Sequence, residues 1–129
     1  MTEHQDRVDL TAAADLCDKA ADVIDTDGWF RGEMWLGAAA GERWEPGKPV
    51  CAVGALRVAA GHLDRDDMIA RSRNEAYHAA RSALEQLLGG PFAIVPWNDN
   101  QAQTAGQVSG KWREAGKALR ERAGQEPPS

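Results

Sequence analysis

The chain has 129 residues with a formal net charge of −5, and 43% of its residues are hydrophobic and 27% charged. This length suits one domain, which can bury a core without a disulfide or a metal. The composition excludes wholesale disorder, and no apolar run approaches the roughly 20 residues that span a bilayer. The polar, acidic start lacks the pattern of a secretory signal, so we expect a cytoplasmic protein that does not bind membranes.

The two cysteines, Cys17 and Cys51, are expected to be free thiols in a reducing compartment. Cysteine and histidine do not occur at the spacings of a structural zinc site. The stretch Asp64-Arg65-Asp66-Asp67 lacks the glycine and the downstream glutamate of a calcium loop, and its acidic residues suit a helix start instead. The sequence therefore predicts no metal and no cofactor.

The first predicted element is an amphipathic helix that begins after Asp9 and stops at Gly28. Aspartate is a good N-cap, and glycine provides the left-handed stop. Apolar residues recur at spacings of three and four, which places them on one face of a helix: Leu10, Ala13, Ala14, Cys17, Ala20, Ala21 and Ile24. Residues 1–8 are expected to form an N-terminal tail.

Residues 28–50 contain three of the five tryptophans, Trp29, Trp35 and Trp44, between repeated glycines and prolines. The glycines and prolines break any helical period, yet the indoles carry too much apolar surface for a solvated linker. We expect an irregular or short two-stranded segment folded over the helices.

Residues 51–60 are apolar on nearly every side and rich in alanine and glycine, which predicts a short helix at the centre of the domain, ended by Gly61. A longer helix is then predicted from Asp64 or Asp66 to Leu88, where Gly89-Gly90-Pro91 terminates it.

Residues 92–95 are β-rich and lie between two prolines, which favours a short strand or extended segment. Residues 96–100 have the composition of a turn. Thr104 and Gln107 match a capping box, so a last helix is expected to run to about Ala123.

These elements predict a mostly α fold: a compact four-helix single domain over residues 9–123. A central small-residue apolar helix and one or two short strands or extended segments complete it, and residues 124–129 are expected to be a disordered C-terminal tail.

Two motifs carry a family resemblance, Cys51-Ala52-Val53-Gly54-Ala55-Leu56 and Trp97-Asn98-Asp99. With the Gly-Trp step at residues 28–29, their order resembles an uncharacterised family found in actinobacteria and their bacteriophages. The resemblance spans about residues 10–120. It implies a small accessory protein of phage or actinobacterial origin and brings no catalytic residues with it.

Cys51 is the most suggestive single residue for catalysis. It would occupy the first turn of a helix, where the dipole and free amides stabilise a thiolate. A nucleophile needs a base, for which His62 and His78 are candidates, with Asp99 or Asn98 as the orienting group. The alternative interpretation makes Cys51 a small core residue, inert because burial raises a thiol pKa.

Trp97, Asn98 and Asp99 allow two interpretations. The indole packs on the core while the two polar side chains turn the chain by bonding to nearby amides. In the functional alternative, Asp99 acts as an acid or base, or Trp97 provides a platform for stacking.

The sequence favours a non-enzymatic accessory protein that binds a host or regulatory protein. Tryptophan is enriched among the residues that dominate binding energy, so the predicted contact residues are Trp29, Trp35, Trp44, Trp97, Asn98 and Asp99. One alternative is a small cysteine-dependent enzyme. A weaker one is nucleic-acid binding through the basic helix at residues 104–123, which the acidic balance of the chain disfavours.

Overall fold

The computed structural model describes residues 9–64 and 74–125. This part of the chain forms five α-helices and a 3-10 turn: α2 (Leu10–Asp27), η1 (Ala38–Ala40), α3 (Ala52–Ala59), α5 (Glu75–Leu87), α6 (Ile94–Asn100) and α7 (Ala105–Gln125). The mostly helical class is confirmed. The predicted count of four helices is not confirmed, because α6 adds a fifth.

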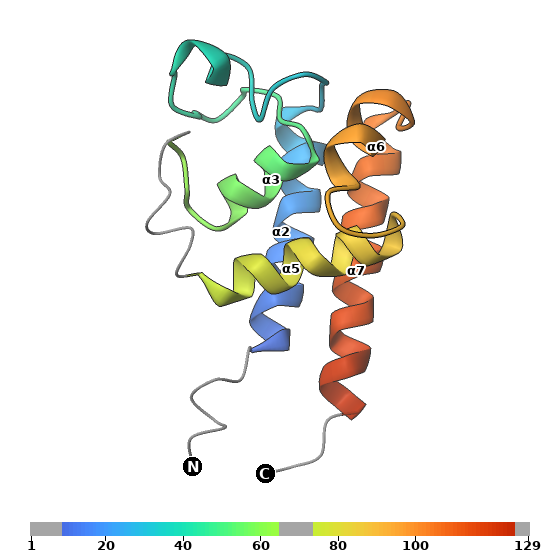
Figure 1. The fold of residues 1–129 in the computed structure, drawn as a ribbon. Helices are drawn as coiled ribbons and strands as arrows, with labels where there is room; N and C mark the ends of the chain where they lie inside the picture. Colours follow the sequence, from blue (N-terminus) through green and yellow to red (C-terminus); the bar gives the residue numbers. More distant parts are fainter. Residues whose placement is uncertain (1–8, 65–73, 126–129) are drawn as a thin grey trace.

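The two longest helices, α2 and α7, lie side by side and run in opposite directions, and α5 crosses them (Figure 1). The buried face of α2 consists of the seven apolar residues predicted from its spacing. Asp9 caps this helix by accepting a 3.0 Å hydrogen bond from the Ala12 amide. Gly28, with φ of 100°, ends it as expected.

Small residues bring α2 and α7 close together. At Gly116 of α7, a Cβ atom would lie 3.0 Å from Asp18 Oδ1 and 3.2 Å from the Ala14 carbonyl oxygen. A larger residue at this position would force the helices apart, so the small residues set the spacing on which the core depends.

Outside this contact, each of two arginines of α7 forms ion pairs with two aspartates of α2. Arg113 lies 3.1 Å from Asp22 and 2.9 Å from Asp25. Arg120 makes the matching contacts, at 2.9 and 2.8 Å, with aspartates about two turns earlier in α2, Asp15 and Asp18. The acidic start of the chain and its basic end therefore neutralise each other within the fold.

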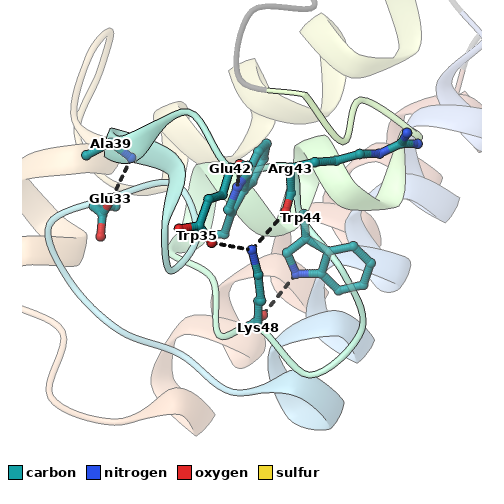
Figure 2. A network of polar contacts seen from close by, with 7 residues as sticks. All are labelled: Glu33, Trp35, Ala39, Glu42, Arg43, Trp44 and Lys48. Atoms are coloured by element: carbon teal, nitrogen blue, oxygen red, sulfur yellow. Dashed lines mark hydrogen bonds and ion pairs between the residues drawn. The ribbon is translucent and has the colours of Figure 1, made fainter.

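The tryptophan-rich segment packs on this frame without forming a sheet within the described residues. Val50 makes isolated bridges to Trp29 and to Trp35, which replace the predicted short strands. Trp35 and Trp44 are buried, and their indole N–H groups donate to the carbonyl oxygens of Glu42 (2.8 Å) and Lys48 (2.9 Å). As Figure 2 shows, the Lys48 ammonium group in turn contacts Glu42 and the Arg43 carbonyl. Hydrogen bonds within the tryptophan-rich segment thus hold it in place around two indoles that lie in the core.

Three predicted elements differ from the structure. A single helix from Asp64 or Asp66 to Leu88 is wrong, because α5 begins at Glu75; Asn74 is extended there and accepts a 2.9 Å hydrogen bond from the Tyr77 amide. Residue 66 itself lies outside the described residues. Gly61 does follow α3, whose backbone ends at Ala59.

The predicted strand at 92–95 and turn at 96–100 are also wrong, because residues 94–100 form α6. Pro96 is the third residue of this helix, where an amide N–H has no intrahelical partner, so proline does not disrupt it. Ile94 and Asn98, four residues apart, face the core together. This helical spacing was present in the sequence, but the run was too short to be recognised by its period.

The capping box at the start of α7 is confirmed. The Gln107 amide donates to Thr104 Oγ1 (3.1 Å), and Gln107 Oε1 accepts from the Thr104 amide (3.2 Å). The helix continues to Gln125, beyond the predicted end at Ala123.

We predict that Gly54→Ala strongly destabilises the protein. A Cβ atom at Gly54 would lie 1.7 Å from the Met34 carbonyl oxygen, which also accepts a 2.9 Å hydrogen bond from the Cys51 amide. Backbone must move to relieve this clash, at a cost of about 3 kcal/mol, the upper end for overpacking. Urea unfolding monitored by circular dichroism measures the change.

The matched control is Gly110→Ala in the interior of α7, where a Cβ meets no atom within 4 Å. That variant is expected to gain about 0.5–1 kcal/mol from helix propensity. Equal effects of the two substitutions would contradict the close approach at Gly54.

Candidate functional site

A pocket of about 320 Å³ opens between the loop at residues 32–34, the start of α3, α5 and α6. Its apolar lining consists of Met34, Cys51, Val53, Ile94 and Val95. Its polar lining consists of Gly32, Glu33, Arg81, Asn98 and Asp99. An apolar cavity with a few polar groups, at the lower end of the usual size range, is the ordinary form of a ligand site. Cys51, Asn98 and Asp99, all predicted candidates, are brought together here.

Asn98 holds the walls of this pocket together. Its Oδ1 accepts hydrogen bonds from Trp29 Nε1 (2.7 Å) and from the Ala52 amide (3.0 Å). Its Nδ2 donates to the Phe30 carbonyl (3.4 Å) and to Asp99 Oδ1 (3.0 Å). The side chain is 1% exposed, so these bonds are the partners that replace water. Asn98 thereby joins α6 to both the tryptophan-rich segment and the start of α3.

Ala52 is held from a second side, because its carbonyl oxygen accepts a 3.1 Å hydrogen bond from Trp112 Nε1 of α7. The first residue of α3 is therefore fixed by two side chains from distant parts of the chain. Two residues further on, Gly54 admits the Met34 carbonyl, which leaves no space for a side chain there.

Asp99 and Glu33 bring two carboxylates to the pocket. Asp99 Oδ1 also accepts from the Gly32 amide (3.2 Å), and Glu33 Oε1 accepts from the Ala39 amide (2.6 Å; Figure 2). The guanidinium group of Arg81, whose side chain is 35% exposed, lies 3.7 Å from Glu85. The pocket thus combines an apolar floor with carboxylates held by backbone amides.

Cys51 is the N-cap of α3, and its Sγ accepts a 3.4 Å hydrogen bond from the Gly54 amide. Burial raises the pKa of the Cys51 thiol, with the charge of Asp99 as a lesser contribution in the same direction. The helix start lowers this pKa through its amides, but by less than burial raises it. The thiol is therefore held in its neutral, weakly nucleophilic form.

The two candidate bases do not line the pocket that contains Cys51. His62 is buried against the Tyr77 ring, with 5.8 Å between centroids, and its Nε2 lies 3.4 Å from Asn74 Nδ2. His78 is exposed and packs on the Tyr77 ring as well, at 5.5 Å. The structure therefore does not assemble the cysteine–histidine pair that the sequence suggested.

Burial corrects part of the predicted contact surface. Trp35 and Trp44 belong to the core, so they are removed from any surface of the folded chain. Trp29 and Trp97 are half-buried, and the Arg31 guanidinium lies 5.4 Å from the centroid of the Trp29 ring. Trp29 also donates its indole N–H to Asn98 Oδ1, so this side chain has a structural role in the fold.

The exposed apolar residues near the pocket were missed by sequence reasoning. Val95, at the pocket edge, is 49% exposed, and Phe92, three residues earlier, is 82% exposed. Phe92 has a left-handed backbone with φ of 65°, and its amide donates to Glu85 Oε2 (3.1 Å). The Gly89-Gly90-Pro91 run before Phe92 indicates a turn in the sequence. The exposure of the Phe92 ring, however, depends on the path that this turn takes in the folded chain.

The remaining predicted sites receive no support from the geometry. Arg113 and Arg120 of the basic helix are engaged by aspartates of α2, which reduces the charge available to a phosphate backbone.

Of the acidic stretch 64–67, only Asp64 belongs to the described residues. Over residues 9–64 and 74–125, no group of three His, Cys, Asp or Glu side chains is placed to hold a metal ion. No helix in these ranges has the length and apolar character needed to cross a membrane.

These observations define a small α-helical domain whose helices α3, α5 and α6 surround an apolar pocket with two carboxylates. The chain belongs to the family of unknown function DUF6197, whose model matches residues 9–118. The resemblance to a family without an assigned activity is confirmed to this extent. No curated protein and no solved structure matches the chain.

We predict that neither thiol reacts with iodoacetamide in the folded protein at neutral pH. Burial, assisted by Asp18, raises the pKa of Cys17 to about 12, and burial raises that of Cys51. Both thiols are thus protonated. We expect their alkylation to be slower than in the unfolded chain by about 100-fold or more. Mass spectrometry of samples labelled with and without urea measures the rates. Rapid labelling of Cys51 in the native protein would restore the enzyme hypothesis.

We predict that Asn98→Asp destabilises the protein by about 3 kcal/mol at neutral pH, because a buried donor becomes an acceptor that faces the Phe30 carbonyl and Asp99. Burial and Asp99 raise the pKa of the introduced carboxyl above its unfolded value of about 3.9. The loss is therefore smallest below that value and grows as the pH rises through the folded pKa.

Urea unfolding of variant and native protein across this pH range measures the difference. The control is Asn100→Asp at the exposed end of α6, where little change is expected. A loss that does not vary with pH, or one shared by the control, would argue against the assigned role of Asn98.

Proposed function

We propose that this chain is a non-enzymatic accessory protein that binds another protein through the pocket and its apolar edge. In this proposal a side chain of the partner enters the pocket while Phe92 and Val95 pack beside it. The observation that carries the proposal is an 82% exposed phenylalanine, in a left-handed backbone conformation, two residues before the α6 residues Ile94 and Val95 that line an apolar pocket.

The energetics favour a functional reason for this arrangement. A non-glycine residue at positive φ costs about 1–3 kcal/mol, and such strain clusters at functional sites. The Phe92 ring gains little from burial in the isolated chain, because most of its surface is open to water. On binding, an exposed aromatic ring beside a pocket becomes the kind of anchor that dominates interface energy.

The chemistry of the pocket supports binding rather than covalent catalysis. The Cys51 Sγ accepts a hydrogen bond from a backbone amide, and the pKa of this thiol is raised. No imidazole of the described residues lines the pocket. The contact surface proposed here keeps Asp99 from the sequence prediction, keeps Asn98 as the support of the pocket walls, and replaces the buried indoles by Phe92 and Val95.

The resemblance to actinobacterial and phage proteins supports a more specific setting for this proposal. In that setting the chain acts in the cytoplasm, and the partner is a host or regulatory protein. The Cys-Ala-x-Gly-Ala-Leu and Trp-Asn-Asp motifs would then serve to preserve the pocket walls in related chains.

The test places a photo-crosslinking phenylalanine analogue at position 92 and irradiates the protein in an extract of its source cells. We expect a discrete adduct with one protein, because the ring at this position lies within the interface. The same analogue at Lys117, which is exposed on α7, is the control and should give no such adduct.

With the partner identified, Phe92→Ser and Val95→Ser are each expected to weaken its binding about 10-fold or more, as loss of an anchor does. Lys117→Ser should leave the affinity unchanged. Identical adducts at both positions, or serine variants that bind normally, would refute the proposed surface.

A further inference from the structure

The charges of the pocket define the chemistry of the group that it accepts. Glu33 and Asp99 line it, and neither carboxylate forms an ion pair within residues 9–64 and 74–125. Arg81 contributes a positive group to the lining, but Glu85 lies 3.7 Å from its Nε. Among the lining residues, the two carboxylates therefore outnumber the single guanidinium group.

Both carboxylates are held in place before any ligand arrives. The Gly32 amide and Asn98 Nδ2 donate to one oxygen of Asp99, and the Ala39 amide donates to one oxygen of Glu33. These donors are neutral, so they orient the carboxylates without cancelling their charge. A preorganised charge costs little further entropy when an oppositely charged group binds.

The negative charge of Asp99 also acts on the apolar part of the pocket lining. Asp99 contributes to the raised pKa of Cys51, a floor residue, although burial is the larger cause. The net charge of −5 acts in the same sense over longer distances, because it attracts cationic partners and repels anionic ones.

We propose that the pocket accepts an apolar side chain flanked by a basic residue, so that the partner presents a hydrophobic anchor next to Lys or Arg. This inference rests on the proposed function and specifies the partner's binding segment. The apolar group fills the space over Met34, Val53 and Ile94, and the cation lies at the edge against Asp99 and Glu33.

Three probes of one shape test the charge preference: 4-phenylbutylamine, 4-phenylbutanol and 4-phenylbutyrate. Each is titrated into ¹⁵N-labelled protein, and the amide shifts of Gly32, Val53 and Val95 report on the pocket, with Gly110 as a distant reference. We expect the amine to bind about 5-fold tighter than the alcohol, in the range of a partly exposed ion pair, and the acid to bind most weakly. High salt should reduce the difference.

Asp99→Asn and Glu33→Gln keep an oxygen for the amide donors while removing the charge, so each should shrink the ratio between the affinities for the amine and the alcohol. Glu114→Gln, which removes an exposed carboxylate paired with Lys111 on α7, is the matched control and should not alter the preference. Val53→Phe should weaken all three probes if they occupy the pocket.

Equal affinity for all three probes, tighter binding of the acid, or no shift with any probe would overturn the inference. These outcomes are separate from failure of the proposed function. If the serine variants at positions 92 and 95 still weaken binding of the cross-linked partner, the surface remains valid and only its charge preference is refuted.

Discussion

The side chain of Asn98 is the interaction on which the rest of the site depends. It comes from α6, but its hydrogen bonds end on the Trp29 indole, the first residue of α3 and the loop at Phe30. One buried amide thus joins α6 to the loop at residues 29–30 and to the start of α3, and the backbone bridge between Trp29 and Val50 holds these last two together. Because a buried amide must satisfy its donors and acceptors, these segments have a single arrangement that leaves none of those groups unpaired. The pocket is the space that this arrangement leaves beside α5.

Two kinds of constraint divide the molecule. Between α2 and α7 the constraint is steric: small residues and Gly116 set the distance, and the exposed arginine–aspartate pairs align the surfaces at little energetic gain. Around α3 the constraint is polar, because Ala52 is bonded on both sides and the Met34 carbonyl occupies the space over Gly54. The first region provides the frame, and the second positions the candidate binding surface on it.

Sequence reasoning succeeded where the signal was local. The buried face of α2, its aspartate cap and the capping box of α7 depend on residues within a few positions of one another. It failed at α6, whose seven residues include a proline and whose helical form is stabilised by contacts across the chain. It also assigned Trp35 and Trp44 to a surface, since an indole within a glycine-rich segment looks the same in sequence whether it faces the core or water.

The amino-acid sequence by itself determined that this is a helical domain with a hydrophobic core, because helical periodicity, caps and glycine stops act through neighbouring residues. Only the tertiary structure decided that Cys51 is a neutral cap, that the histidines lie elsewhere, and that Phe92 is left in water. Those properties arise from burial and from groups tens of residues apart. No local pattern encodes a distance between such groups, so the candidate pocket emerges only when the chain is folded.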